Sequence, residues 1–355
     1  LIGEGNEPVV VRSLQQGTVI GESVSLRRTN ETIDIVVGGP GRLWGDAGVP
    51  TSTPLLSTHA SQLGPANIEF ADGLRAAGRI LQKTTLDFTG SMTTREYRLL
   101  DRVSFGGRTT LQQDDTSLQA DQIDVAFSVV ESWRGVQQSM DHVVGLGNVL
   151  MNQGSDRLTC DKMDIAMGAG PDGKASVKSA TATGSVSALQ GDRSLQATDK
   201  LIVDFESAPG KDVVQVTDVA PASTLAAASG QTASQSLKFS SAASPRRLRA
   251  FGEVSVIDPS QSLDLSCEQL DCTIAAGKDI ESAVLCGFAD RPASVKLDTF
   301  SVTGKDITLD VANEWADVPG EGRMTIQSGK DLDGRKVEQP IPIVVTWTDG
   351  MKYRG

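Results

Sequence analysis

Hydrophobic and polar residues alternate over short stretches along most of the chain, which is the period-two pattern of a β-strand with one buried face. Val186 and Ala188 alternate with polar neighbours, and Leu195 and Ala197 resume the alternation after the turn-forming stretch 190–193. Two alternating arms around such a turn predict a β-hairpin. Gly, Ser, Thr, Val and Asp are frequent and long helix-forming stretches are scarce, so the pattern favours an all-β protein.

This hairpin pattern occurs four times, each with a glycine before the first arm and a small residue, Ala or Cys, in the second arm. The separation is 13 residues in the first three copies and 15 in the fourth, for the pairs Gly107 and Ala120, Gly147 and Cys160, Gly184 and Ala197, and Gly252 and Cys267. The equal spacing indicates an internal repeat, and the fourth copy has the longer turn.

In the second arm of these hairpins the alternation slips once. Leu158 and Cys160 share one face, but the next apolar positions are Met163 and Ile165, three residues further on. A step of three turns the apolar face over, and a bulge or bend at that point restores one continuous apolar lining. The third copy departs by an extra residue, Thr198. We therefore expect a twisted antiparallel sheet folded over itself, of the β-taco or jelly-roll kind, built of repeated bent hairpins.

A larger repeat joins the two ends of the chain. Three blocks recur in the same order with offsets of 283, 281 and 277 residues: 21–26 with 304–309, 37–43 with 318–324, and 68–78 with 345–355. Repeats of this kind bury a continuous core by stacking. The spacing predicts that residues 1–50 end one unit, 51–285 form a full unit and 286–355 begin the next.

Three stretches separate the alternating segments. Residues 51–65 are rich in Ser, Thr and Pro, 221–236 form an Ala/Ser/Gly tract, and 328–342 are charged and end in proline. This composition is typical of long loops.

The charge balance limits the possible partners. Lys and Arg number 33 against 45 Asp and Glu, a net charge of −12, which argues against nucleic acid because its affinity comes mainly from basic side chains that neutralise phosphates. Aromatic residues make up only 4%, which is low for a platform that stacks bases or sugars. The acidic balance leaves open a lipid bound through its apolar chains.

Four cysteines allow two interpretations. Cys160 and Cys267 stand at the small position of the bend, where a buried apolar thiol is expected. Cys272 and Cys286 are candidates for a disulfide between neighbouring strands. No Cys-x-x-Cys spacing occurs and no histidine is close in sequence, so no metal site is predicted.

Charged residues recur at the predicted bends. Asp121, Asp161, Asp199 and Glu268 follow the bend by one or two positions; they are interpreted as solvent-facing caps of the bulge rather than as a ladder of cation ligands. Arg42 and Arg323 follow equivalent glycine-rich turns. Each has two candidate partners, a neighbouring carboxylate, which we favour, or a lipid phosphate.

The sequence offers little for catalysis. His59 lies in the Ser/Thr-rich stretch and His142 beside Asp141, without a recurring partner for either. No Gly-x-Ser-x-Gly motif is present. A pair of carboxylates for glycoside hydrolysis needs only proximity in space, so a β-helix-like carbohydrate enzyme stays as a third hypothesis. We predict no catalytic residue and no enzyme.

The repeated pattern Gly-x-Val followed by Leu-x-Ala-Asp-x-Leu-x-Val is carried by Leu118-Gln-Ala-Asp-Gln-Ile-Asp-Val125 and by Gly147-Asn-Val149 with 158–165. It resembles the OstA/LptA-like family of lipopolysaccharide-transport β-jelly-roll (β-taco) proteins. With weaker copies at 195–203 and 265–272, the resemblance covers about 103–274.

This resemblance implies a non-enzymatic protein of the periplasm or cell envelope, whose sheet folds into a groove that holds lipid acyl chains. It implies lipopolysaccharide or another acylated lipid as cargo, edge-strand pairing with neighbouring units or like proteins as in a periplasmic bridge, and no cofactor. The Gly-Pro-Gly-Arg-Leu block of 39–43 and the Asp-Gly-Leu/Met blocks depart from the family's short pattern. They indicate a larger, multi-unit relative.

The predicted groove is lined by the alternating apolar residues of the four hairpins: Leu111, Leu118, Ile123, Val125, Val149, Leu158, Met163, Ile165, Val186, Leu195, Leu201, Val203, Val254, Leu265 and Leu270. The same residues would form the closed core of a structural or adhesive envelope protein without cargo, which is the alternative function. The two differ in whether the faces of the sheet meet or leave a groove.

Overall fold

The structure is a computed structural model of the chain. It describes residues 8–13, 17–44, 67–86, 92–113, 116–132, 135–169, 175–206, 244–275, 280–298, 300–311, 313, 315–330 and 336–354. Among these residues no helix combines the length and the apolar character that spanning a bilayer requires.

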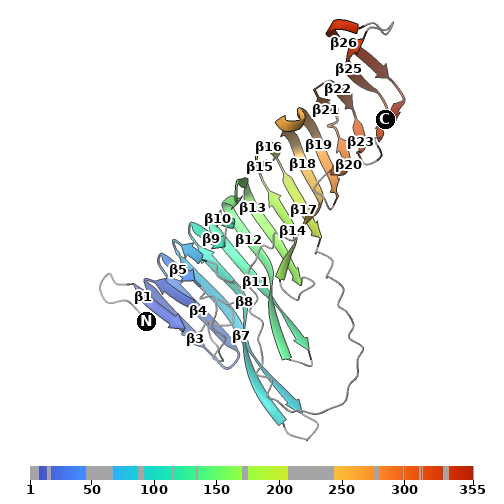
Figure 1. Cartoon of the computed structure of the whole chain (residues 1–355). Coiled ribbons are helices and arrows are strands. Elements are labelled where there is room, and N and C mark those ends of the chain that lie inside the picture. Colours follow the sequence, from blue (N-terminus) through green and yellow to red (C-terminus); the bar gives the residue numbers. More distant parts are fainter. Residues whose placement is uncertain are drawn as a thin grey trace, which may run out of the picture.

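The described residues form an elongated, all-β molecule in which the strands follow one another along the long axis (Figure 1). All strand pairs are antiparallel, and they build two facing sheets. The first sheet runs in the order β1 (Val9–Ser13), β2 (Gly17–Gly21), β5 (Gly41–Trp44), β6 (Asn67–Phe70), β9 (Thr109–Gln113), β10 (Thr116–Ala120), β12 (Gly135–Gln153), β13 (Asp156–Ala169), β15 (Val186–Gln190), β16 (Arg193–Ala197), β18 (Ser244–Asp258), β19 (Leu263–Ile274), β21 (Ala293–Leu297), β22 (Phe300–Gly304), β25 (Gly322–Lys330) and β26 (Lys336–Trp347).

The second sheet lies against the first. Its order is β3 (Ser23–Arg28), β4 (Thr32–Gly38), β7 (Gly73–Leu86), β8 (Met92–Gly106), β11 (Gln122–Ser132), β12, β13, β14 (Ala175–Thr183), β17 (Lys200–Glu206), β18, β19, β20 (Ile280–Cys286), β23 (Asp306–Asp310), β24 (Trp315–Pro319) and β27 (Gly350–Arg354). Strands β12, β13, β18 and β19 take part in both sheets because they bend between them.

The chain passes from one sheet to the other at a corner, and the corners form one edge of the molecule. In β13, Cys160 and Met163 are buried whereas Asp161 and Lys162 between them are exposed. The paired strands β12 and β13 shift register at the same place, between Leu146 and Val149. The predicted slip of alternation is therefore a corner, and the predicted all-β fold of repeated bent hairpins is confirmed.

The predicted hairpin turns are also present. The fourth copy is longer because a 3-10 turn, η1 (Pro259–Gln261), is inserted in it and capped by Asp258, whose side chain accepts a hydrogen bond from the Ser260 backbone. The extra residue of the third copy, Thr198, lies in a corner. Its hydroxyl accepts a hydrogen bond from the Glu253 backbone N–H group at 2.9 Å. The added residue thus supplies an acceptor for a backbone group of the neighbouring corner.

The larger repeat has the same local geometry at both ends. Gly73 and Gly350 occupy equivalent corners with φ of 130° and 142°, a conformation that favours glycine. A Cβ atom on Gly21 would lie 2.3 Å from Val37 Cγ1, and one on the equivalent Gly304 would lie 2.3 Å from Val318 Cγ1. Both sheets continue past residues 50 and 285, and the unit boundaries there stay a prediction.

One predicted loop is wrong in part. Residues 328–342 were expected to form a loop, but β25 and β26 extend through much of this stretch, with Ser328 opposite Ile341 and Gln327 opposite Pro342. The prolines are tolerated because β26 pairs only with β25 among the described strands, and an edge strand does not need every N–H group for the sheet. Residues 51–65 and 221–236 lie outside the described residues.

Candidate functional site

The space between the two sheets is lined by apolar rows that run along the molecule, parallel to the corner edge. In the row of the first sheet next to the corners, Val149, Val186 and Val254 are all buried, at 2% exposure each. The facing row of the second sheet includes Ile123 and Leu285, both fully buried. Side chains of both sheets belong to one core cluster, so the narrow part of the wedge next to the corners is filled.

All the predicted lining residues lie in this inner space. Most of them are buried in the core: Leu111, Leu118, Ile123, Val125, Val149, Met163, Ile165, Val186, Leu201, Val254, Leu265 and Leu270. The other three, Leu158, Leu195 and Val203, are half-buried and pack against the core. The sequence thus identified the inner face, and the structure divides it into a closed part and a partly accessible part.

The accessible part is a contiguous strip in the middle of the molecule, one row further from the corners. In the first sheet each member of the strip lies beside the next across adjacent strands: Met151, Leu158, Ala188, Leu195 and Val256. In the second sheet Ala180, Val203 and Leu248 lie side by side in the same way. All eight are half-buried. We call these residues the open strip.

The same row is closed on both sides of the open strip. Leu118 in β10 is 1% exposed, and Leu265 in β19 and Val295 in β21 are 6% and 3% exposed. In the second sheet, Ile165 and Cys272 flank the strip and are buried as well. The wedge is therefore sealed at either end of the strip and partly open between β12 and β18.

Beyond the open strip, the first sheet carries a polar lip at its hairpin ends. Arg193 Nε lies 2.7 Å from Asp258 Oδ2, and Gln190 donates a hydrogen bond to Asp156 at 3.1 Å. The hydroxyl of Ser260, which donates to Asp258, and the charge of Arg193 hold the pKa of Asp258 below its usual range. The apolar strip thus ends in charged and amide groups that remain polar at neutral pH.

The recurrent acids are at the corners and act as caps, as interpreted from the sequence. Asp121, Asp161 and Asp199 are exposed and Glu268 is half-buried. The Asp121 backbone donates to Gly147 O at 2.9 Å, and its carboxylate accepts from Asn148 at 2.8 Å. Asp121, Asp161 and Asp199 lie against the corner glycines of the neighbouring strands, Gly147, Gly184 and Gly252. Among the described residues no group of acids, cysteines and histidines has the arrangement of a metal site.

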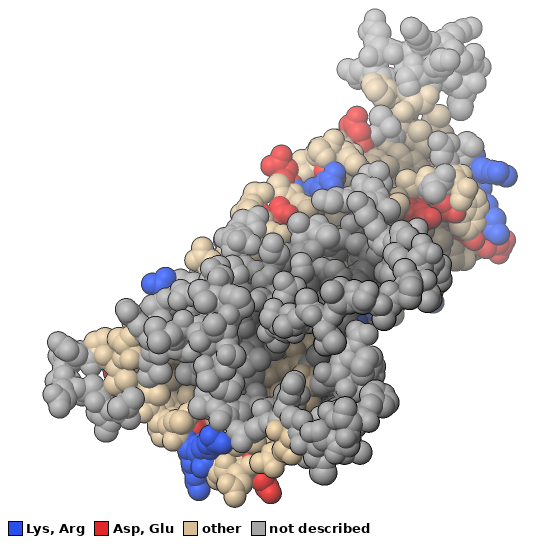
Figure 2. Space-filling model, turned by 60° about the horizontal axis from the view of Figure 1, so that its bottom comes forward, with Lys and Arg blue, Asp and Glu red and all other residues tan. Residues whose placement is uncertain are grey.

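Ion pairs cover the outer face of the second sheet. Asp124 is 5% exposed and accepts hydrogen bonds from Arg102 and Gln122. Burial alone would raise the pKa of Asp124, but hydrogen bonds from Ser104, Gln122 and Arg102 outweigh it and hold the pKa below its ordinary value. Arg247 with Asp271 forms a second pair of this kind. On the face shown in Figure 2, basic and acidic side chains lie interspersed rather than as a field of one sign.

The four cysteines are free thiols. Burial raises the pKa of Cys160 to about 11 and those of Cys267 and Cys272 to about 12, as expected for apolar thiols. Cys272 lies opposite Ala283, and Cys286 lies opposite Gln269, three residues away on β19. Because Cys272 faces the core and Cys286 is paired through the other face with Asp306, the candidate disulfide does not form.

His142 lies between two carboxylates. Its Nδ1 is 3.0 Å from Asp164 Oδ1 and its Nε2 is 3.6 Å from Asp141 Oδ2. Both ring nitrogens face carboxylates, which is a surface charge arrangement. His59 lies outside the described residues.

Five residues of the open strip were absent from the predicted lining: Met151, Val256, Leu248, Ala180 and Ala188. The alternation of Val149 with Met151 and of Val254 with Val256 was a sufficient signal for the first two. Leu248 stands among three arginines, and only its pairing with Val203 and Cys272 shows that it faces inward.

No protein-family model, no curated protein and no solved structure matches this chain.

Proposed function

We propose that this chain is a non-enzymatic β-repeat protein of the cell envelope that binds lipopolysaccharide or a related acylated lipid, with the acyl chains on the open strip. The observation that supports this proposal most directly is the contiguous, half-exposed apolar strip between β12 and β18. Covering a partly exposed apolar strip with an acyl chain is favourable, by about 25 cal/mol for each Å² of apolar surface removed from water.

The polar lip supports the same proposal. An acyl chain on Leu195 and Val256 would place its head group near Arg193 and Asp258, which end the same strands. An apolar pocket with a few polar groups at its rim is the usual form of a lipid site. Conduction along the molecule, by contrast, requires the closed ends of the strip to open.

Pairing with neighbouring units belongs to this proposal. Among the described strands, β1 and β3 at one end and β26 and β27 at the other each have a sheet neighbour on one side only. Unpaired strand edges are templates for another chain. We assign these edges to neighbouring repeat units or like proteins, in the periplasm or cell envelope.

The burial of the core favours a second candidate function. Most of the predicted lining is closed, with Ile123 and Ile165 at 0% and 2% exposure. A structural or adhesive envelope repeat without cargo needs a filled interior of this kind.

The first test is native mass spectrometry of the purified chain, with extraction of co-purified lipid and titration with lipopolysaccharide. We expect a bound acylated lipid that is released only on denaturation. A lipid-free mass, together with no uptake of added lipopolysaccharide, would instead favour the structural function.

The site is located with an acyl lipid that carries a diazirine on its chain. We expect crosslinks at Leu195 and Val256. We expect none at Leu189, on the adjacent strand β15, or at Ile257, beside Val256 on β18, which are each 44% exposed on the outer face. A matched pair of variants gives a second readout: Val256→Asp weakens binding and Ile257→Asp does not. Circular dichroism and thermal unfolding establish that both variants are folded. Equal crosslinking of the two faces would contradict the assignment.

A further inference from the structure

The loop 287–292 interrupts the row of tight corners between β20 and β21 and stands out from the corner edge. Gly287 N donates to Lys305 O at 2.6 Å, which fixes the base of the loop beside the next corner. A Cβ on Gly287 would lie 2.5 Å from Ala293 N, so the loop closes tightly on itself. Arg291 lies over the Phe288 ring at 4.5 Å and donates to Glu253 at 2.8 Å, which holds the loop on its other side.

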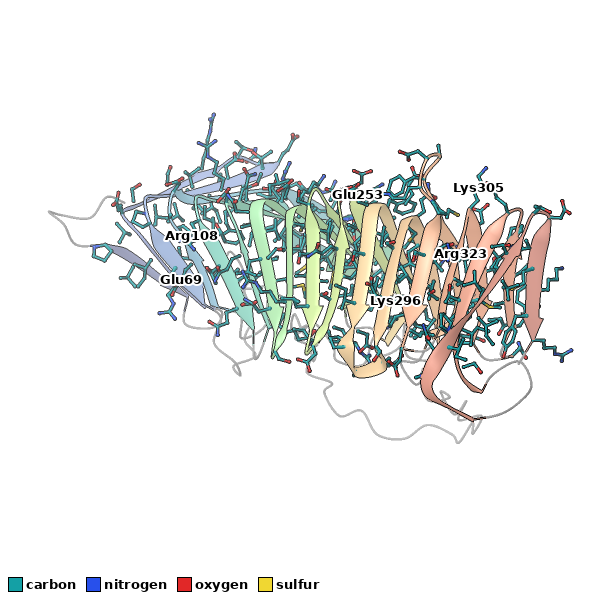
Figure 3. All side chains as sticks on the ribbon, turned by 90° about the horizontal axis from the view of Figure 1, so that it is seen from above. Glu69, Arg108, Glu253, Lys296, Lys305 and Arg323 are labelled. Atoms are coloured by element: carbon teal, nitrogen blue, oxygen red, sulfur yellow. The ribbon has the colours of Figure 1, made fainter. Side chains whose placement is uncertain are left out.

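A hollow of about 490 Å³ lies between this loop and the outer face of the first sheet. Its basic side chains come from three elements: Arg291 from the loop, Lys305 from the corner after β22, and Arg323 from β25. Figure 3 shows Glu253 and Lys305 at the corner edge on either side of the protruding loop, and Arg323 on the sheet below Lys305. Asp290 and Glu321 also line the hollow.

The larger repeat provides an internal reference for these charges. The equivalent surface at the N-terminal end carries Glu22, Arg42 and Glu69 where this one carries Lys305, Arg323 and Thr346. In the N-terminal copy, Arg42 Nε is 3.6 Å from Glu69 Oε1, across strands β5 and β6.

In the C-terminal copy Arg323 lies opposite Thr303 and Thr346, and within the described chain neither it nor Lys305 makes an ion pair. Across these three positions the net charge changes from −1 to +2.

From this exchange we propose that the hollow bounded by the loop, Lys305 and Arg323 binds a phosphate group. Arg323 presents a planar guanidinium suited to phosphate oxygens, and Lys305 adds a second positive charge from the corner. The hydroxyl of Thr346 offers a further hydrogen bond, while that of Thr303 donates to Arg323 O at 3.4 Å. Asp290 and Glu321 favour a ligand whose phosphate carries a polar or cationic neighbour. This site is on the outer face, apart from the open strip, and the proposal stands independently of the proposed function.

The test is binding of inorganic phosphate and of lysophosphatidic acid at low ionic strength, by calorimetry and ³¹P NMR. We expect both Arg323→Gln and Thr346→Glu to weaken binding about tenfold or more. Arg323→Gln removes a charge-assisted contact with the phosphate. Thr346→Glu gives Arg323 the carboxylate partner that Arg42 has in Glu69. Arg42→Gln is the matched control and leaves binding unchanged. Higher salt weakens binding because the groups are exposed.

The two probes separate the sources of the phosphate. Similar affinities that are both weakened by Arg323→Gln point to a soluble phosphate compound, and a preference for the lipid that is lost in Arg323→Gln points to a head group; both results support the site. Absence of binding for both probes contradicts it, as does an equal loss in Arg42→Gln and Arg323→Gln. Lysophosphatidic acid that binds unchanged in Arg323→Gln contradicts this site and leaves the open strip as its place. Inorganic phosphate that binds through Arg323 while acyl lipids do not bind contradicts the proposed function alone.

Discussion

At the scale of single residues, Asp124 shows how the outer face of the second sheet tolerates a buried charge. Its side chain is 7% exposed and is satisfied by Arg102 from β8 and Gln122 from its own strand. A buried carboxylate is costly unless such partners are present. The arrangement is therefore a stabilising element.

We predict that Asp124→Asn lowers the free energy of unfolding at pH 7 by about 1–2 kcal/mol, because charge-assisted hydrogen bonds are lost. The folded pKa of Asp124 is lowered, so its contribution is present above the ordinary carboxyl pKa and is lost as the pH falls through the lowered value. The difference between the variant and the parent should thus shrink below about pH 4. Urea unfolding at a series of pH values measures it.

The control is Asp101→Asn, whose carboxylate pairs with Arg79 at 3.3 Å on an exposed surface. Exposed pairs contribute little, so this variant should change stability by about 0.5 kcal/mol or less. A pH-independent effect of Asp124→Asn would show that packing, rather than charge, determines it.

At the scale of elements, the corner is the unit on which the fold is built. Gly184 has φ of 73°, and a Cβ there would lie 2.1 Å from Asp161 Oδ2 of the neighbouring corner. The Asp161 backbone in turn donates to Gly184 O at 3.3 Å. Glycine and acid are therefore coupled across adjacent corners, which explains why both recur in the sequence with fixed spacing.

We predict that Gly184→Ala destabilises the protein more than Gly191→Ala. Gly191 also has a positive φ, 57°, but nothing lies within 4 Å of an added Cβ. Gly191→Ala should cost about 1 kcal/mol from the left-handed backbone alone. Gly184→Ala adds the displacement of Asp161 to that cost.

Thermal and urea unfolding of the two variants measure this difference. Equal destabilisation would mean that the corner acid moves aside freely, and the cap would then have no structural role.

At the scale of the whole molecule, the interior is closed over most of its length and partly open in the middle. Met151, Leu158, Ala188, Leu195 and Val256 succeed one another across adjacent strands of the first sheet. A strip of this extent covers several methylene groups of an extended chain. Binding should therefore depend on the length of the acyl chain.

We predict that the affinity for single-chain lipids with the same head group rises by about 0.8 kcal/mol for each added CH₂, until the chain exceeds the strip. Because the strip is apolar, this increment should hardly change between low and high salt, in contrast to the phosphate contacts of the outer face. Calorimetric titration with a series of chain lengths measures it. Affinity that is independent of chain length would contradict acyl binding in the wedge.

The sequence by itself determined the four hairpins, their corners and the inner face, but not the extension of strands β25 and β26 through much of 328–342. Alternation assigns each residue to a face because successive side chains of a strand point to opposite sides, and the slip after Cys160 marked a corner because a step of three reverses the face. The repeated spacing located equivalent corners such as those of Gly73 and Gly350.

Only the tertiary structure decided which part of the inner face is open. Leu118 and Leu195 have the same pattern in sequence, yet the first is 1% exposed and the second is half-buried. Exposure depends on what the opposite sheet places over each residue, and strands distant in sequence supply that cover. The loss of a carboxylate partner by Arg323 likewise depends on cross-strand register. The repeat aligns Thr346 with Glu69 in sequence, but only the pairing of β26 with β25 and of β6 with β5 places them opposite Arg323 and Arg42.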